Sequence, residues 1–268
     1  MPLSLKKILR SLTPPLVADV CVDRFRAVRY VGNYGTWDEA RARAEGYHAP
    51  NILAQVTEAA RAARDGRLAF ERDGIAFATP SYNWPRLACL LREAHRQGEE
   101  LRVLDFGGSL GSVYFQHRRW FENFKTRWAV VEQPGFVDIG RREFTTEELS
   151  FHFEMADAIR AIEPTVVLFS GVLAWIEQPH SILEEIVAAR LPAILVDRTP
   201  LTGLDRDVAR VQHVPASIYK ASYPCWFLSR ERFLSHFEAA YRLEAELPSH
   251  DPTVEGTEFG GLYFTLRQ

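Results

Sequence analysis

The fold is decided by the stretch Leu101-Arg102-Val103-Leu104-Asp105-Phe106-Gly107-Gly108-Ser109-Leu110-Gly111-Ser112. It begins as a short apolar run, reaches an acid at Asp105 and breaks into a glycine-rich turn before a segment of helical character. A buried strand that ends at glycines and continues as a helix leaves backbone N–H groups directed at whatever lies over the turn. Glycine is needed there because a Cβ would hold a ligand away from the backbone. The stretch therefore predicts a ligand-binding turn.

Two cofactor-binding patterns compete for this turn. A dinucleotide fingerprint requires G-x-G-x-x-G after the strand. Setting its last two glycines on Gly108 and Gly111 puts Phe106 in the first position, and setting its first glycine on Gly107 puts serines in the other two. The alternative pattern, D-x-G-x-x-x-G, is complete with Asp105, Gly107 and Gly111. The second pattern is therefore favoured.

A second acid strengthens that choice. Glu132 ends the next apolar run, Trp128-Ala129-Val130-Val131-Glu132. A carboxylate about 20 residues beyond the glycines can accept hydrogen bonds from both ribose hydroxyls of an adenosine. The two acids and the turn together favour a cofactor that contains adenosine.

This combination resembles motif I and the following acidic motif of the class I S-adenosylmethionine-dependent methyltransferases. The resemblance implies that the methionine moiety lies over the glycine turn and the ribose on the second acid. It carries over as cofactor-binding residues Asp105, Gly107, Gly108, Ser109, Gly111 and Glu132. Ser109 departs from the commonest form of the family, which has glycine there, although a small side chain still fits. The alternative of an ordinary strand-to-helix turn without a cofactor stays open.

Four blocks of the chain resemble a narrower group. They are residues 32–40 (GNYGTWDEA), 104–111 (LDFGGSLG), 196–200 (VDRTP) and 223–231 (YPCWFLSRE). Together they resemble a bacterial family of methyltransferases often encoded among surface-polysaccharide genes, including those for lipopolysaccharide and O-antigen. The resemblance implies O-methyl transfer to a hydroxyl of a sugar or a sugar-derived intermediate.

The rhythm of the chain predicts an α/β fold. Strands and helices alternate, which is typical of a parallel sheet covered on both faces. We expect a Rossmann-like, seven-stranded, mostly parallel sheet whose C-terminal strand is antiparallel. The expected strands lie at about 102–106, 127–132, 149–154, 165–170 and 193–197, with helices near 112–121, 136–143, 157–162 and 179–190, and a C-terminal hairpin formed by 241–247 and 261–267.

The N-terminal part has a different texture. Residues 1–75 are rich in Ala and Arg, with helical periodicity over 51–64, and predict a helical extension before a methyltransferase domain over 76–268. We expect this extension and the long segment 199–223 to cover the glycine turn as a lid. The stretch 3–12 predicts a helix that packs on its own domain, with a basic helix resting on a membrane surface as the alternative.

Further cofactor contacts are expected at the carboxyl ends of the strands, where ligands of open α/β sheets bind. The resemblance makes Asp157 a partner for the adenine amino group and places Ala156 beside the ring. The alternative for Asp157 is a helix N-cap. Ser170 and Gly171, after the fourth strand, are expected near the sulfonium. No metal is required.

Candidate catalytic residues follow the fifth strand. His213 is the candidate general base, because histidine titrates near neutrality without any perturbation. Arg198 and Tyr223 are candidates for binding a polar or anionic group of the substrate. Structural roles are the alternative for all three residues.

Composition narrows the classes of function. The chain has 268 residues and a formal net charge of -3, so it carries no basic footprint for nucleic acid. Three scattered cysteines indicate a reducing cytoplasm, and no stretch reads as an integral membrane span. The expected partner is a small-molecule acceptor; the sequence carries no signal for an oligomeric state.

Two other functions stay open. A nicotinamide-dependent oxidoreductase or epimerase acting on nucleotide sugars is disfavoured, because the chain lacks G-x-G-x-x-G and a Tyr-x-x-x-Lys pair. A methyltransferase-like fold that binds a ligand or a partner protein without turnover is the second alternative.

Overall fold

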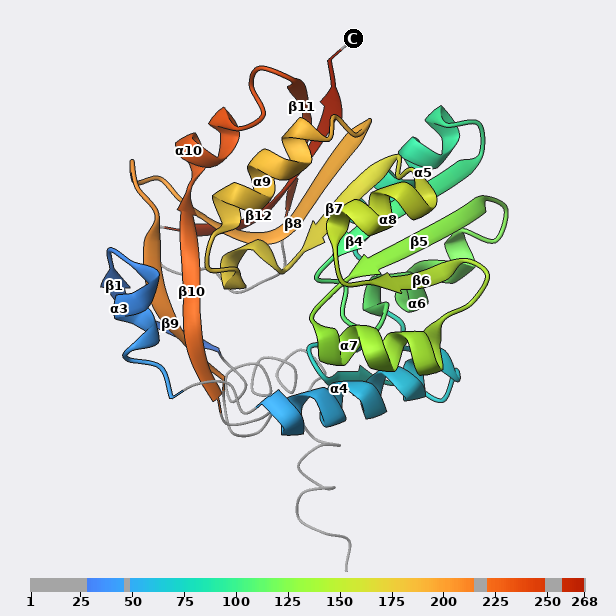
Figure 1. The fold of residues 1–268 in the computed structure, drawn as a ribbon, viewed down its shortest axis with the longest axis horizontal. Coiled ribbons are helices and arrows are strands. Elements are labelled where there is room, and N and C mark those ends of the chain that lie inside the picture. Colours follow the sequence, from blue (N-terminus) through green and yellow to red (C-terminus); the bar gives the residue numbers. More distant parts are fainter. Residues whose placement is uncertain (1–27, 46–48, 215–220, 249–256, 268) are drawn as a thin grey trace, which may run out of the picture.

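The computed structural model describes residues 28–45, 49–214, 221–248 and 257–267. Its centre is a set of parallel strands in the spatial order β6-β5-β4-β7-β8 (Figure 1). These strands are buried on both faces, as shown by β7, in which four successive apolar residues, Val166 to Phe169, have no exposed surface. Such continuous apolar runs are typical of a covered parallel sheet. The bounds are β4 Glu100–Phe106, β5 Lys125–Val131, β6 Leu149–His152, β7 Val166–Ser170 and β8 Ala193–Thr202.

Helices cover both faces of this sheet. One apolar cluster joins residues of α5 (Trp84–Arg96), α6 (Ser112–His117) and α7 (Pro134–Ile139) to one face. A second cluster joins α8 (Met155–Ile162), α9 (Pro179–Ala188) and α10 (Arg230–Ser235) to the other. The prediction of a mixed α/β fold with a mostly parallel central sheet is therefore confirmed, and it is consistent with a Rossmann-like methyltransferase fold.

The strand order reverses between β4 and β7. From β4 the chain moves outward through β5 to β6, then crosses back to β7 on the other side of β4. In open α/β sheets, ligands bind in the crevice beyond the carboxyl ends of the strands at such a reversal. The glycine turn follows β4, and Ser170 ends β7 and is followed by Gly171, so both lie at this point.

The C-terminal hairpin forms as expected. Strand β12 (Thr257–Leu266) pairs antiparallel with β8, and β11 (Tyr241–Pro248) pairs antiparallel with β12. The two strands extend the parallel sheet on the side of β8. The alternation of apolar and polar residues in 241–247 was therefore a correct signal for a sheet edge.

The sheet differs from the expected seven strands, because the described residues form a ten-stranded sheet. Segment 199–223 is not a lid loop throughout: β8 continues to Thr202, and β9 (Val208–Val214) and β10 (Ala221–Ser229) follow. Strand β1 (Arg29–Tyr34) pairs with β9, which pairs with β10. The physical reason is that 208–214, rich in valine, is itself a good strand sequence.

The N-terminal segment contains strands as well as helices. Besides β1, it has α3 (Trp37–Arg41), α4 (Ala49–Arg64) and a hairpin of β2 (Phe70–Arg72) and β3 (Ile75–Phe77), which spans the proposed boundary at residue 75. Thr36 caps α3 in a reciprocal capping box with Glu39. The stretch 3–12 lies outside the described residues. Within the described parts of the chain, no helix has the length and apolar composition needed to cross a membrane.

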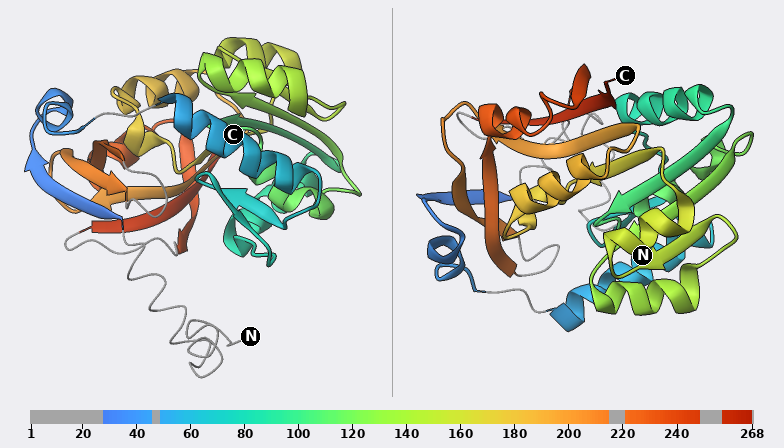
Figure 2. Two further views of the ribbon diagram at one scale, coloured as in Figure 1. Left: turned by 90° about the horizontal axis from the view of Figure 1, so that it is seen from below. Right: turned by 45° about the horizontal axis from the view of Figure 1, so that its top comes forward.

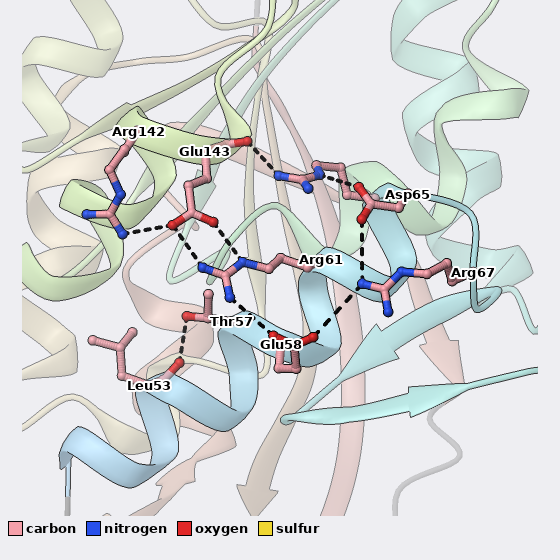
Figure 3. Close-up of polar contacts among 9 residues, drawn as sticks. Leu53, Thr57, Glu58, Arg61, Asp65, Arg67, Arg142 and Glu143 are labelled. Carbon is pink, nitrogen blue, oxygen red and sulfur yellow. Dashed lines mark hydrogen bonds and ion pairs between the residues drawn. The ribbon is translucent and has the colours of Figure 1, made fainter.

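Helix α4 is fastened to the domain by charged contacts. Arg61 donates from Nε and Nη2 to the two carboxylate oxygens of Glu143 at 2.7 and 3.0 Å (Figure 3). Arg64 donates to the Glu143 carbonyl at 2.8 Å. Glu143 belongs to a π-helical turn, Gly140–Phe144, that continues α7. In the left view of Figure 2, α4 and the β2–β3 hairpin lie together along one side of the domain. The extension is thus held next to the helix that follows Glu132.

Candidate functional site

The glycine turn packs closely against the side chains of Val172 and Asp105. Gly107 has a φ of 72°, and a Cβ placed there would lie 2.3 Å from Cγ2 of Val172. A Cβ at Gly108 would lie 2.5 Å from the carboxylate of Asp105. Ser109 adopts a φ of 56°, a left-handed conformation that favours glycine. The departure at Ser109 therefore carries a backbone strain that glycine would avoid.

Asp105 lies beneath this turn and is 1 % exposed. Its Oδ2 accepts a hydrogen bond from Trp128 Nε1 at 3.0 Å, whereas its buried Oδ1 has no hydrogen-bond partner among the described residues. Burial raises the pKa of this carboxyl to about 7, a rise that the Trp128 hydrogen bond opposes. An unsatisfied buried acceptor under a close-fitting glycine turn fits a ligand that brings a hydrogen-bond donor.

Glu132 comes directly to the same turn. Its Oε2 accepts from the backbone N–H of Gln133 at 2.7 Å. Burial raises the pKa of Glu132, and hydrogen bonds from the backbone N–H groups of Gln133 and Ser109 oppose that rise. The N–H of Gly107 donates to the Val131 carbonyl at 2.9 Å, which ties the turn to the end of β5. The two acids and the glycines that the sequence singled out are thus brought together.

Ser170 and Gly171 also reach this place. Gly171 donates its N–H to the Asp197 carbonyl at 3.0 Å, and the next residue, Val172, packs under Gly107. Ser170 accepts a hydrogen bond from Arg86 Nη1 at 2.9 Å and lies 3.4 Å from Asp197 Oδ2. The loop after β7 therefore forms the neighbouring wall of the site.

Ala156 and Asp157 lie at the start of α8 and are exposed. Asp157 forms an ion pair with Arg160 on the same helix. The N-cap of α8 is Glu154, so the alternative that made Asp157 the N-cap is wrong. No described contact joins either residue to the glycine turn, and their role towards adenine stays a prediction.

A buried ion pair beneath the site was missed by the sequence reasoning. Arg86 of α5 donates to Asp197 Oδ2 at 2.9 Å, and Asn83 Nδ2 donates to the same oxygen at 3.0 Å. The side chains of Arg86 and Asp197 are 6 % and 2 % exposed. Burial lowers the pKa of Arg86, against the attraction of Asp197. The only sequence signal was an arginine early in an amphipathic helix, which by itself reads as a solvated charge.

Arg198 reaches the site from the residue after Asp197. It has a φ of 53°, and its Nη1 would lie 3.2 Å from a Cβ at Gly171. Its Nη2 donates to Asp73 Oδ2 at 3.1 Å, in the turn of the β2–β3 hairpin. Arg198 thus links the N-terminal extension to the loop after β7.

The other two candidate catalytic residues, His213 and Tyr223, lie on opposite faces of one pair of strands. His213 pairs with Ser222, and Tyr223 pairs with Gln212, so the side chains of His213 and Tyr223 point to opposite faces of the β9–β10 sheet. The face of His213 is the one on which Ala209 and Val211 pack against Ala40 of α3. This register argues against His213 as a base at the glycine turn.

Tyr223 lies on the opposite face. Gln212, which shares that face, accepts a hydrogen bond from Trp175 Nε1 at 2.7 Å. Trp175 belongs to a 3-10 turn, η3 (Leu173–Trp175), that follows Gly171. The Tyr223 face is therefore the one turned towards the loop after β7.

Glu71 of the hairpin is a second residue that the sequence reasoning missed. It is 3 % exposed, accepts a hydrogen bond from the hydroxyl of Ser112 and accepts another from the Gly74 N–H at 2.9 Å. Burial raises its pKa to about 7, against the opposing effect of these hydrogen bonds. Ser112 is the first residue of α6 after the glycine turn, so a buried acid of the extension contacts the helix start that follows the turn.

Glu71→Gln should flatten the pH dependence of stability. The folded pKa of about 7 lies above the ordinary 4.5, so the folded state holds its proton longer and stability falls as pH rises towards 7. Between about pH 5 and pH 7.5 the wild type should lose about 2 to 3 kcal/mol more than the variant. Urea unfolding at both pH values measures this. The pKa of Asp105 is also raised, so the stability of both proteins should still decline somewhat as pH rises. Glu238→Gln, at an exposed position, is the control. Parallel stability curves would refute the assignment.

Comparisons with known proteins give distant structural similarity only. No protein-family profile matches the chain, and no curated protein matches it. Among solved structures, it is similar to the Burkholderia thailandensis 1,6-didemethyltoxoflavin-N1-methyltransferase, at 16 % identity and a TM-score of 0.45, over 91 % of this chain and 96 % of that one. It is also similar to DesVI of Streptomyces venezuelae, at 13 % identity and a TM-score of 0.42, over 69 % and 92 %. The [4+2]-cyclase SpnF is similar at 12 % identity and a TM-score of 0.46, over 80 % and 93 %.

Proposed function

We propose that the protein is a methyltransferase that uses S-adenosylmethionine to methylate a small molecule, at a hydroxyl of a sugar or a surface-polysaccharide intermediate. One observation supports the choice of cofactor. Three features lie together where the strand order reverses, as the sequence resemblance implies: a glycine turn, a buried acid with a free oxygen, and a second acid. The acceptor follows from the four blocks that resemble the polysaccharide-associated family.

The residues around the turn suit that chemistry. When bound, the cofactor supplies a methyl group activated on a sulfonium. Glu132 is placed to accept hydrogen bonds from ribose hydroxyls, and Asp105 Oδ1 is free to accept one from the ligand. Methyl transfer is an in-line displacement, so the main task of the protein is alignment and exclusion of water. The Arg86–Asp197 pair holds Ser170 and the loop after β7 in place for that alignment.

The N-terminal extension belongs to the same proposal. Leu53 of α4 would lie 3.0 Å from a Cβ at Gly135, just after Glu132. Glu71 contacts Ser112, and Asp73 contacts Arg198. Contacts from the extension thus reach α6, α7 and β8 beside the turn, which supports its role as a cover of the cofactor. Arg198 and Tyr223 remain the residues proposed to hold the acceptor.

A binding module without turnover is the second candidate. The orientation of His213 towards α3 favours it, because that orientation takes the candidate base away from the turn. Ser109 in a left-handed conformation favours it as well. Such a protein would bind the cofactor but transfer no methyl group.

The test is calorimetric titration with S-adenosylhomocysteine, with NAD as the control ligand. We expect micromolar binding of the first alone. Glu132→Ala removes charge-assisted hydrogen bonds to the ribose, each worth about 1.5 to 3 kcal/mol, and should weaken binding about 100-fold or more.

Glu238 is an exposed acid in the turn between α10 and β11, and Glu238→Ala should bind like the wild type. Absence of binding in a folded wild-type protein would refute the proposed cofactor. Binding without methyl transfer to any of a panel of sugars would support the binding module instead.

A further inference from the structure

Arg210 is a half-buried arginine that has no counter-charge among the described residues. It lies in β9 opposite Cys225, and its Cζ stands 4.5 Å above the ring centre of Phe227. Within the part of the chain that the structure describes, its buried Nε has no hydrogen-bond partner, and no carboxylate lies within ion-pair distance of the guanidinium. Burial lowers the pKa of the guanidinium, consistent with its poor solvation. The side chain as a whole is half-buried, so its outer edge can be reached from solvent.

The contrast with Arg86 shows how unusual this is. Arg86 is more deeply buried, and it has Asp197 at 2.9 Å, Ser170 at 2.9 Å and Gln116 at 3.3 Å as partners. Buried charges are ordinarily paired, because desolvation of an unpaired ion is costly. An arginine that the fold holds in place but does not pair is suited to receive its counter-ion from a ligand.

The position of Arg210 connects it to the proposed site. Arg210 and Gln212 share one face of β9, and Trp175 of η3 donates to Gln212 at 2.7 Å. Phe227, under the guanidinium, packs in one cluster with Ala174 of η3. In Figure 1, β9 and β10 stand beyond β8 as a wall at one end of the sheet. Arg210 therefore lies on the wall that faces the loop after β7, the loop that borders the cofactor turn.

We propose that Arg210 binds an oxyanion, a carboxylate or a phosphate, carried by the molecule that receives the methyl group. This proposal rests on the proposed function. Phe227 packs against the guanidinium, and the part of the planar fork that solvent can reach can form two parallel hydrogen bonds to two oxygens. The acceptor is thereby a sugar acid or a sugar phosphate rather than a neutral sugar.

The test compares thermal unfolding of the full chain in inorganic phosphate, in acetate and in chloride at matched ionic strength. Binding to the folded state raises Tm, by a few degrees when the free anion is ten times its Kd. We expect a rise in phosphate, in acetate or in both, relative to chloride; the first indicates a phosphate ester and the second a carboxylate. Arg210→Met should abolish this rise.

Two further variants keep the result interpretable. Arg206→Met removes an exposed arginine from the loop before β9 and should keep the full anion response, including any general salting effect. Arg210→Lys retains the charge but loses the planar fork, so it should fold like the wild type and lose most of the response. An anion response that persists in Arg210→Met and Arg210→Lys, or that is absent from the wild type, would overturn the proposal.

The two proposals fail in different ways. Binding of S-adenosylhomocysteine without an anion response at Arg210 leaves the methyltransferase proposal intact and removes this one. An anion response that depends on Arg210, in a protein that binds no S-adenosylhomocysteine, removes the methyltransferase proposal and with it the assignment of the oxyanion to a methyl acceptor.

Discussion

Asp197→Ala should destabilise the protein by about 3 to 5 kcal/mol. The substitution leaves the guanidinium of Arg86 buried without its carboxylate, and it also removes the acceptor for Asn83 Nδ2 at 3.0 Å. Removing one partner of a buried ion pair costs far more than the net contribution of the pair, because an uncompensated charge stays in a poorly solvating place. Urea unfolding followed by circular dichroism measures the loss.

A double-mutant cycle separates the pair from its surroundings. Arg86→Met in the Asp197→Ala background should recover part of the lost stability, because the orphaned charge is then gone. The exposed pair Arg230–Glu246 is the matched control, and Glu246→Ala should cost less than about 1 kcal/mol. If Asp197→Ala costs no more than this control, the pair is not the support that its burial implies.

The same pair has a consequence for the site. Ser170 is held by Arg86, and Gly171 donates to the Asp197 carbonyl. Weakening the pair therefore frees the loop after β7, whose Val172 supports Gly107. A loss of stability and a loss of ligand binding are expected to occur together in Asp197→Ala.

The local geometry of the candidate site could be predicted from the sequence. Strand β4, the turn and Glu132 follow from apolar periodicity and glycine spacing, and their meeting needs only that β5 pairs with β4. The Arg86–Asp197 pair joins positions 111 residues apart. No periodicity encodes such a contact, because it depends on the packing of α5 over the end of β8.

The orientation of His213 could not be predicted from the sequence for a related reason. The choice of His213 assumed that 199–223 was a loop whose side chains were free to turn towards the cofactor. In a strand, the face of each side chain is fixed by register, and a shift of one residue would exchange His213 for Gln212. That register depends on pairing with β1, 184 residues earlier in the chain (Arg29 with His213), which composition and spacing do not reveal.

Gly107→Ala should destabilise the protein by about 2 to 5 kcal/mol and abolish binding of S-adenosylhomocysteine. Two effects add: alanine at a φ of 72° costs about 1 to 2 kcal/mol, and its Cβ would stand 2.3 and 2.8 Å from Cγ2 and Cβ of Val172, which requires the loop after β7 to move. Movement of that loop or of the turn separates the two walls of the site.

Gly66→Ala isolates the first effect, because Gly66 has a φ of 71° and no atom within 4 Å of the added Cβ. Gly66→Ala should lose only the stability that alanine costs at a positive φ, and it should bind S-adenosylhomocysteine normally. The difference between the two variants then measures the contact with Val172. A third variant, Gly107→Ala with Val172→Ala, removes that obstruction and should recover part of both stability and binding. Equal losses of stability in Gly66→Ala and Gly107→Ala, with binding retained in both, would contradict this prediction. The turn would then require a left-handed residue but no close packing against Val172, and the proposed cofactor site would lose its structural basis.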